Sequence, residues 1–512
     1  MSTIIRNLGI DLGSSGTTVV GYTAGGKEAL LFRDTVEGRD YFETALATKH
    51  IPSDTPEGEK ATLAAQLLGN GDSGDVFFIG HGGTFFYDKL KEGLLTEPDT
   101  DRSRAYLRAY LRYILEAISE SGSYDFSEVE SICFGYPAYD HAGSTSSYIA
   151  TISNILTDTF ARRDGRSIQR FSLPEPILAA TSYLHANPNA VKPGSLLLVV
   201  DCGGYSIDLA LVEVCRDGDL VYPKEKVPAI SVDGGYTLAL GKAMTADILS
   251  LVYEKLELDE ACPFYDRGVE AAKRAFFSAY EKNARHAEDM AITHLGRHFF
   301  LSCGKPHPGE DEVDLSTEMG IDHAFETIAC HVLDYLRKLK GEGIITDGHA
   351  IGGILMTGGA ARMKPLRDAI VSQVRSKLQR FNGAILLTDE GKGNAALLKT
   401  ADSSAPADLS SDTAVALGAA LIAKSPRLLQ KISCRVIARD PIAKSTMELE
   451  QANEQLYRLR MARLGIEERL TSWVEQLTAA EGGRGSFSVS PADLTGLLQE
   501  FLPKIGNADE NK

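Results

Sequence analysis

The sequence has few cysteines, and no two of them are spaced as a metal or redox motif requires. Its 7 cysteines are scattered over 512 residues, and none stands in a Cys-x-x-Cys arrangement. This spacing argues against a zinc site and against the disulfide framework of small secreted domains. We therefore expect a cytoplasmic protein with reduced thiols.

Long apolar runs are missing as well. No stretch reaches the roughly 18 uninterrupted apolar residues that a membrane-spanning helix requires. Residues 1–11 lead directly into a short apolar strand, without the apolar segment and small-residue cleavage site of a secretory leader. We expect no leader peptide and no membrane partner.

Basic side chains are outnumbered by acidic ones, 53 against 70, which gives a formal net charge of −17. Such a surface repels nucleic-acid phosphates, so we expect no nucleic-acid partner. Neither a Gly-x4-Gly-Lys-Ser/Thr phosphate loop nor a Gly-x-Ser-x-Gly elbow occurs, which excludes P-loop enzymes and hydrolases built on that elbow. What remains is a globular composition, 43% hydrophobic and 24% charged, with a length sufficient for roughly two to four domains.

Strands and helices alternate along the chain. Apolar runs that end in glycine-rich turns predict strands at residues 7–12, 195–201, 207–214 and 351–357. Helical patterns lie between them, among them residues 103–119, 268–290 and 322–340. The sequence therefore predicts a mixed α/β fold.

One pattern occurs twice. Residues 7–22 and residues 195–214 each contain an apolar strand, Asp-x-Gly, small polar residues and a second apolar strand. Each copy predicts a β-hairpin with an acidic, glycine-rich tip. Two such copies predict a bilobal protein whose hairpin tips face one another across a cleft.

The two tips carry the groups that a phosphate chain and its metal need. Backbone N–H groups hold phosphate oxygens, small hydroxyls lie beside them, and carboxylates hold a hydrated Mg²⁺. The first tip offers Asp11, Gly13, Ser14 and Ser15. The second offers Asp201, Gly203, Gly204, Ser206 and Asp208. Asp-x-Gly alone is a common turn, but two matched copies favour a phosphate site.

A series of segments resembles the nucleotide-binding domain of the seventy-kilodalton heat-shock chaperones, which belong to the actin-like ATPase superfamily. The two hairpins are similar to the phosphate loops of that family. The further matching segments are residues 137–139, 175–184, 270–274, 354–362 and 414–421. They follow the order of the family and span about residues 5–424, which argues against chance agreement.

The resemblance implies a bilobal actin-like ATPase. Its two ribonuclease-H-like lobes would occupy residues 1–190 and 191–424 around a nucleotide cleft, and residues 425–512 would form a C-terminal helical tail. The implied ligands are ATP or ADP with Mg²⁺. Three aspartates, Asp11, Asp201 and Asp208, would hold the metal through its waters and orient the attacking water.

The resemblance also implies the remaining site residues. Ser206 would lie near the γ-phosphate, and Gly234 and Gly235 resemble a second phosphate-side pair. The residues expected around the adenosine are Glu270, Lys273, Arg274, Gly358, Gly359 and Arg362.

The catalytic lysine of the family stands four residues before a glycine. This spacing selects Lys89, with Lys91 as the second choice. Pro137 and Glu175 match a proline and a glutamate that sense the nucleotide in the family.

Two positions depart from the family pattern. Tyr205 replaces a glycine of the second phosphate loop, and a tyrosine does not freely adopt the positive φ that glycine permits, so hydrolysis is expected to be slow. Ala360 lacks the hydroxyl that the family has beside the adenosine.

Function is expected to be that of an ATP-binding, slowly hydrolysing, chaperone-like conformational switch. Residues 425–512 show no train of short alternating strands, so the usual peptide-binding domain is not expected. Two alternatives remain open: a filament-forming actin-like protein, and a small-molecule kinase of the same superfamily.

The tail predicts a helix that begins near Ser445. Ser445 and Glu448 fit a capping box, and an apolar stripe follows at three- and four-residue steps. The stripe either forms a short coiled coil with a second copy or a protein partner, anchored by Trp473, or packs back on the ATPase body as ordinary core.

Overall fold

The computed structural model contains two compact units, Met1–Arg435 and Val436–Lys512. The described residues all belong to the first unit. They are residues 3–34, 40–48, 77–78, 85–87, 90–96, 101–122, 124–138, 144–160, 167–204, 206–232, 241–256, 269, 272–273, 276–277, 291–294, 297–302, 311–315, 320–346, 349, 351–377, 384–387, 398–401, 409–410 and 412–432.

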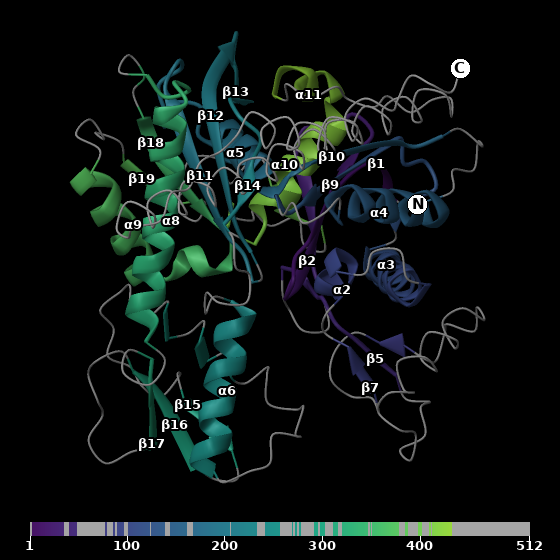
Figure 1. The fold of residues 1–512 in the computed structure, drawn as a ribbon. Coiled ribbons are helices and arrows are strands. Elements are labelled where there is room, and N and C mark those ends of the chain that lie inside the picture. The colour runs from purple at the N-terminus through teal and green to yellow at the C-terminus, as the bar shows by residue number, and fades with distance from the viewer. Residues whose placement is uncertain are drawn as a thin grey trace, which may run out of the picture. The chain divides into compact units, whose positions relative to one another are not determined.

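A first mixed sheet has the strand order β10-β9-β1-β2-β3-β20 (Figure 1). The bounds are β1 Thr3–Leu12, β2 Gly16–Thr23, β3 Ala29–Phe32, β9 Ser131–Tyr136, β10 Gln169–Pro174 and β20 Leu398–Thr400, with β4 Phe42–Glu43 paired to β2 and β8 Tyr124–Asp125 paired to β1. Strand β1 is antiparallel to β2 and parallel to β9. This strand order places β1, at the start of the chain, beside β9, which lies more than a hundred residues later.

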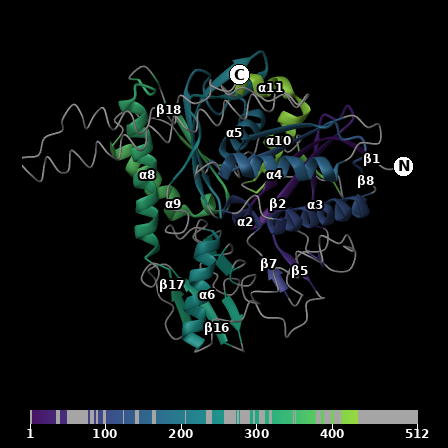
Figure 2. The same cartoon turned by 45° about the vertical axis from the view of Figure 1, so that its right-hand side comes forward.

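Helices α2 (Leu90–Thr96), α3 (Asp101–Gly122) and α4 (Ser144–Thr159) pack together beside this sheet (Figure 2). Helix α3 buries its apolar residues at three- and four-residue steps, from Leu107 through Tyr110 and Ile114 to Ile118. That periodicity forms one apolar face, which joins the core of the sheet.

A second mixed sheet has the order β13-β12-β11-β18-β19. The bounds are β11 Leu196–Cys202, β12 Ile207–Asp217, β13 Leu220–Glu225, β18 Ile351–Thr357 and β19 Ala384–Leu387, with β14 Ile230–Ser231 paired to β12. Strand β11 is buried throughout, as its continuous apolar run predicts for a central strand. Helices α8 (Ile321–Gly341) and α9 (Lys364–Lys377) pack against each other and contribute to a separate core under this sheet.

Helices α5 (Glu175–Ala186) and α10 (Ala414–Lys424) join the two sheets. They lie side by side, with α10 against β1 and β9 and α5 against β11, β12 and β13 (Figure 1). The close packing depends on glycine: a Cβ at Gly418 would lie 2.0 Å from the Leu178 carbonyl oxygen, and one at Gly9 would lie 2.2 Å from that of Ala416. The glycine in the 414–421 segment is therefore a packing requirement of this helix pair.

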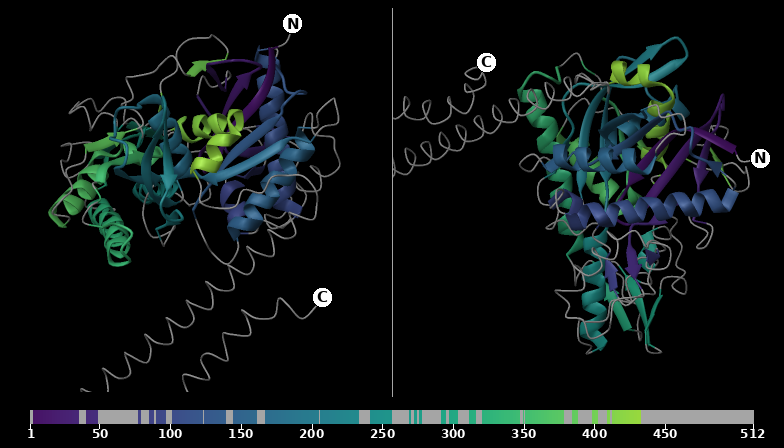
Figure 3. Two further views of the ribbon diagram at one scale, coloured as in Figure 1. Left: turned by 90° about the horizontal axis from the view of Figure 1, so that it is seen from above. Right: turned by 90° about the vertical axis from the view of Figure 1, so that its right-hand side faces the viewer.

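Two small sheets complete the first unit. One consists of β15 (Ala291–His294), β16 (Arg297–Ser302) and β17 (Asp311–Asp314), with α6 (Lys242–Leu256) against β17 (Figure 3). The other consists of β5 (Leu46–Thr48), β6 (Phe77–Phe78) and β7 (Phe85–Tyr87). A short helix α11 (Pro426–Ile432) follows α10 and contacts β13.

The predicted α/β class is confirmed, and so are the four predicted strands, which correspond to β1, β11, β12 and β18. The predicted helices at residues 103–119 and 322–340 correspond to α3 and α8. Most of the helix predicted at 268–290 and all of the tail helix lie outside the described residues. No helix in the described part of the chain combines the length and apolarity needed to cross a bilayer.

Candidate functional site

A cavity of about 1050 Å³, its open mouth included, gathers residues from both hairpins. The first hairpin contributes residues between Asp11 and Thr18, and the second contributes residues between Asp201 and Ser206. The other lining residues are Tyr41, Lys91, Glu175, Gly241, Lys273, Phe277, Gly358, Gly359, Ala360, Arg362, Met363, Asp412 and Val415. Segments far apart in the sequence therefore meet at one site.

The first hairpin closes with a tight turn between β1 and β2. The Gly13 N–H donates to the Gly16 carbonyl at 3.1 Å, and a Cβ at Gly13 would lie only 2.5 Å from that oxygen. Asp11 pairs across the strands with Thr18. Ser14 is buried at the tip, and Ser15 is half-buried beside it. Glycine is therefore required at position 13, because the turn is too tight for a side chain there.

The second hairpin closes in the same way, between β11 and β12. The Gly203 N–H donates to the Ser206 carbonyl at 2.9 Å. Asp201 pairs across the strands with Asp208, and the Ser206 hydroxyl donates to Asp208 Oδ2 at 3.3 Å. Asp208 is only 1% exposed and does not line the cavity, whereas Asp201 does. Tyr205 lies outside the described residues.

The three aspartates form an acidic cluster with raised pKa values. Burial, followed by the charge of Glu175, raises the pKa of Asp11 to about 8 and that of Asp208 to about 7. Burial also raises the pKa of Asp201, together with the charges of Glu175, Asp208 and Asp11. Like charges crowded in a dry environment disfavour ionisation. A cation at this point would relieve that repulsion.

Lys91 supplies positive charge at the cluster. Its ammonium donates to Glu175 Oε1 at 2.6 Å, and both side chains are almost completely buried. Burial is the largest single influence on Lys91 and opposes its charged form, but the charges of Glu175, Tyr148 and Asp11, together with the hydrogen bond to Glu175, outweigh it and raise the pKa of the ammonium. Lys89, the first choice of the sequence, lies outside the described residues. Lys91, the second choice, lines the cavity.

The carboxylates suit a hydrated metal better than a directly ligated one. No group of three carboxylate, imidazole or thiolate side chains in the described ranges is placed to hold an ion directly. Mg²⁺ usually keeps several waters and is held by one or two carboxylates together with substrate phosphates. Burial first, and neighbouring negative charge second, raises the pKa values of Asp11, Asp201 and Asp208, and a hydrated cation at this point would favour their ionised forms.

Lys273 is buried at the cavity and holds a turn beside the second hairpin. Its ammonium donates to the Gly241 carbonyl at 2.6 Å and to Thr245 Oγ1 at 2.7 Å. Gly241 has φ +53°, and a Cβ there would lie 2.3 Å from the Gly204 Cα. Lys273 thus fixes a glycine turn against the second hairpin, a contact that the sequence does not predict.

Besides Lys89, four predicted site residues lie outside the part of the chain that the structure describes. Glu270 and Arg274, which surround Lys273 in the predicted adenosine helix, lie outside the described residues, and so do Gly234 and Gly235.

The two glycines after β18 have different roles. Gly358 has φ +82°, and a Cβ there would lie 2.3 Å from the Cys202 carbonyl oxygen and 2.6 Å from Asp201 Oδ1. Gly359 lines the cavity, and a Cβ there would meet no atom within 4 Å. Gly358 therefore lets the loop pack on the second hairpin, while Gly359 leaves open space for a ligand.

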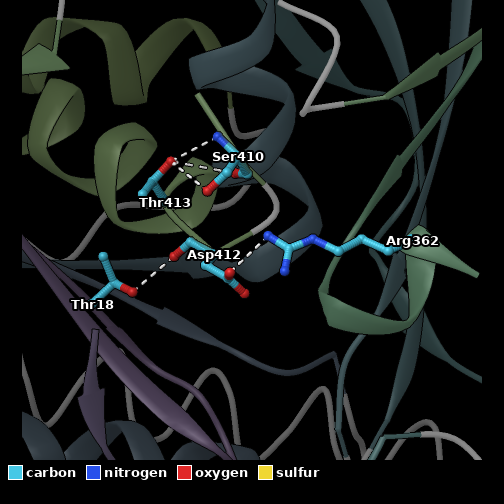
Figure 4. Close-up of polar contacts among 5 residues, drawn as sticks. All are labelled: Thr18, Arg362, Ser410, Asp412 and Thr413. Carbon is cyan, nitrogen blue, oxygen red and sulfur yellow. Dashed lines mark hydrogen bonds and ion pairs between the residues drawn. The ribbon is translucent and has the colours of Figure 1, made fainter. Parts of the chain in front are cut away.

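Arg362 ends the 3-10 helix η2 (Gly359–Arg362) and reaches toward the first sheet. Its Nη2 donates to Asp412 Oδ2 at 2.7 Å, and the Thr18 hydroxyl donates to the Asp412 carbonyl at 2.7 Å (Figure 4). Ser410 and Thr413 stabilise the same segment, because the Ser410 N–H donates to Thr413 Oγ1 at 2.8 Å. Asp412, Thr18 and Tyr41 are cavity residues that the sequence reasoning did not identify.

No protein-family model matches this chain, and no curated protein matches it significantly.

Proposed function

We propose that the chain is an actin-like ATPase that binds ATP or ADP with Mg²⁺ in this cavity and serves as a chaperone-like conformational switch. The observation that carries the proposal is the convergence of two matched acidic hairpin tips and a buried lysine on one cavity. Glycine-rich turns supply N–H groups for phosphates, and the carboxylates supply a site for a hydrated cation.

The bilobal arrangement is part of the proposal. Each large sheet has its own hydrophobic core and its own hairpin, and α5 and α10 connect the two sheets. We infer that the sheets are the centres of the two lobes, with the cavity as the nucleotide cleft. A ligand that contacts both hairpins would favour the arrangement in which they are close together.

The proposed reaction is attack of water on the γ-phosphorus, with release of ADP and phosphate. Asp201 lines the cavity and would orient the water, and the buried Asp208 would support it from the neighbouring strand. Lys91 presents a fixed positive charge that stabilises the negative charge developing on the phosphoryl oxygens in the transition state. Mg²⁺, when bound, would neutralise phosphate charge. Catalysis of this kind depends on positioning and electrostatics.

The switch would couple the phosphate end of the cavity to α5. Glu175 is the first residue of α5 and holds Lys91, and a Cβ at Gly135 on β9 would lie 2.9 Å from Glu175 Cγ. Such tight packing transmits a small change at the phosphates to a helix that contacts the second sheet. This contact favours a conformational role over simple nucleotide storage.

Calorimetric titration of the full chain with ATP and ADP, with and without Mg²⁺, tests the proposal. Gly359→Trp should fill the open space in the cavity and weaken ATP binding by at least tenfold, a threshold of about 1.4 kcal/mol. Glu28→Gln is the control, because Glu28 forms a half-buried ion pair with Lys399, and neither residue lines the cavity. Equal ATP affinity in the two variants would contradict the proposal.

Phosphate release by the wild type tests hydrolysis separately. If ATP binds but no phosphate is released above background, the protein is a nucleotide sensor. Transfer of the phosphate to a metabolite would favour the kinase alternative, and nucleotide-dependent pelleting would favour the filament alternative.

A further inference from the structure

Three side chains lie in a row across neighbouring strands of the second sheet. Within the hairpin, Asp208 on β12 is the cross-strand partner of Asp201 on β11. On the other side of β11, the partner of Asp201 is Thr357, the last residue of β18 (Figure 1). Partners in register present their side chains on the same face of a sheet. Asp201 therefore has a second carboxylate on one side and a hydroxyl on the other.

The row lies on the face of the sheet that α5 covers. The opposite face of these strands, which includes Val200, Leu209 and Met356, belongs to the core that α8 and α9 share. Side chains alternate along a strand, so the row points away from that core. Helix α5 contacts all three strands and contributes no residue to that core. Thr357 is completely buried on this face.

The Thr357 hydroxyl has no hydrogen-bond partner among the described residues, although no part of the residue is exposed. An unpaired buried hydroxyl destabilises a folded protein, and valine, which has the same shape, would avoid that cost. The preceding residues of β18, from Ile354 to Met356, are apolar. The hydroxyl is therefore a costly group at a position where the fold would accept a methyl group.

Asp201 is the group that this hydroxyl can reach. Its carboxylate leans toward the end of β18, since Asp201 Oδ1 would lie 2.6 Å from a Cβ placed at Gly358. Rotation about the Cα–Cβ bond of Thr357 moves the hydroxyl between staggered positions without moving the strand. Neighbouring strands are about 4.8 Å apart, which leaves a hydrogen bond between the two side chains within reach.

We infer that Thr357 is a positioning residue: its hydroxyl donates to the Asp201 carboxylate and holds it toward the water that attacks the γ-phosphorus. Thr357 does not line the cavity, whereas Asp201 does, so the hydroxyl acts on the reaction only through Asp201. Asp208, which as a carboxylate is only an acceptor, cannot supply this donor. The inference rests on the proposed function, because Asp201 has this role only if the cavity hydrolyses ATP.

The test measures phosphate release by the full chain over a range of MgATP concentrations. Thr357→Val should lower kcat about tenfold, the loss expected when the outer partner of a site carboxylate is removed, and should change KM by less than about twofold. Thr357→Ser keeps the hydroxyl and should retain at least about half of the wild-type kcat. The midpoint of urea unfolding should not fall in Thr357→Val, because the methyl group replaces an unpaired polar atom.

Two comparisons separate positioning from a general packing effect. In an Asp201→Asn background, Thr357→Val should change kcat by less than about twofold, because the carboxylate through which the hydroxyl acts is gone. Thr400→Val is the matched control, since Thr400 is also a buried strand threonine but lies in β20 and does not line the cavity. Its kcat should stay within about twofold of the wild-type value.

Turnover by Thr357→Val at the wild-type rate would overturn the inference and leave the proposed function intact. A Thr357→Val variant that does not fold would also overturn it, since the hydroxyl would then be structural. The same holds if Thr357→Ser is as slow as Thr357→Val, or if the loss persists in the Asp201→Asn background. A wild type that releases no phosphate would overturn both the inference and the proposed hydrolysis.

Discussion

The two hairpins have the same framework but carry different side chains. In each, the first aspartate is followed seven positions later by its cross-strand partner, Asp11 with Thr18 and Asp201 with Asp208. Each turn is closed by an N–H to carbonyl hydrogen bond between corresponding residues, at 3.1 Å in the first hairpin and 2.9 Å in the second. The backbone is therefore a repeated unit.

The difference lies in what faces Asp11 and Asp201. Asp201 faces a second carboxylate, whereas Asp11 faces a hydroxyl that donates to the Asp412 carbonyl. The second hairpin thus concentrates negative charge, and the first anchors the segment before α10. Thr18 and Asp208 thus occupy equivalent positions of the repeat but differ in role: Asp208 adds a carboxylate, whereas Thr18 anchors a neighbouring segment.

The largest expected effect concerns Lys91, the buried lysine of α2 that lines the cavity together with both hairpins. Lys91→Met should lower the free energy of unfolding by about 3–5 kcal/mol, because it leaves Glu175 buried without its partner. Urea unfolding followed by circular dichroism measures this change. Lys399→Met removes a partly exposed pair with Glu28 and should cost about 0–1 kcal/mol. If both variants lost the same free energy of unfolding, the buried pair would contribute no more to stability than the Lys399 pair.

The next prediction compares how strongly residues of the two hairpins affect the rate of phosphate release. Asp201→Asn should slow phosphate release on the order of 100-fold, since it removes a carboxylate that lines the cavity. Asp208→Asn acts from the neighbouring strand and should slow release by about tenfold. Thr18→Val, at the corresponding position of the first hairpin, should change the rate by less than about threefold. Equal slowing by Thr18→Val and Asp208→Asn would contradict the division of roles.

A smaller effect tests how the β18 loop depends on the second hairpin. Gly358→Ala should lower the free energy of unfolding by at least about 1–2 kcal/mol, because alanine resists a positive φ and its Cβ would clash with the Cys202 carbonyl. Gly359→Ala points into open space and should leave stability within about 0.5 kcal/mol. Thermal unfolding of both variants measures the difference. Comparable destabilisation would disprove the packing role of Gly358.

The effect that is smallest over a single pH unit is the pH dependence of stability. The pKa of Asp208 is about 7 in the folded protein, above its unfolded value, so its contribution is fully present below about pH 4 and is lost as the pH rises toward 7. Asparagine does not ionise. The stability of Asp208→Asn relative to the wild type should therefore rise by about 1 kcal/mol per pH unit from pH 5 to 7.

The same titration compares the hairpins. The corresponding rise for Asp11→Asn should continue to about pH 8, because burial and Glu175 raise the pKa of Asp11 further. Denaturant unfolding at a series of pH values without Mg²⁺ measures both slopes. A slope of zero for both variants would mean that the carboxylates ionise normally.

Much of the backbone could be predicted from the chain alone. The alternation of Val, Ile and Leu runs with Asp-x-Gly turns identified both hairpins, and three- and four-residue periodicity identified α3 and α8. Ser14, Gly203, Gly359 and Arg362 were chosen from motifs, and all of them line one cavity. Their proposed roles toward a nucleotide stay predictions.

Other residues carried no usable local signal. Lys91 is only the second choice by spacing, and its burial against Glu175, 84 residues away, is a contact that the local sequence does not predict. Asp412 reads as a polar residue before a helix until its contacts with Thr18 and Arg362 are seen. Long-range partners of this kind are set by how sheets and helices pack, which spacing in the sequence does not encode.

The sequence by itself determined the α/β class, the two hairpins and the small residues in their turns, because strand periodicity and turn sterics act over a few neighbouring residues. Only the tertiary structure decided which charges meet. Burial brings Asp11, Asp201 and Glu175 together around Lys91, and it changes the pKa values of the aspartates and the lysine through desolvation and mutual charge. Those forces depend on distances in space, so the same residues in an extended chain would titrate as ordinary side chains.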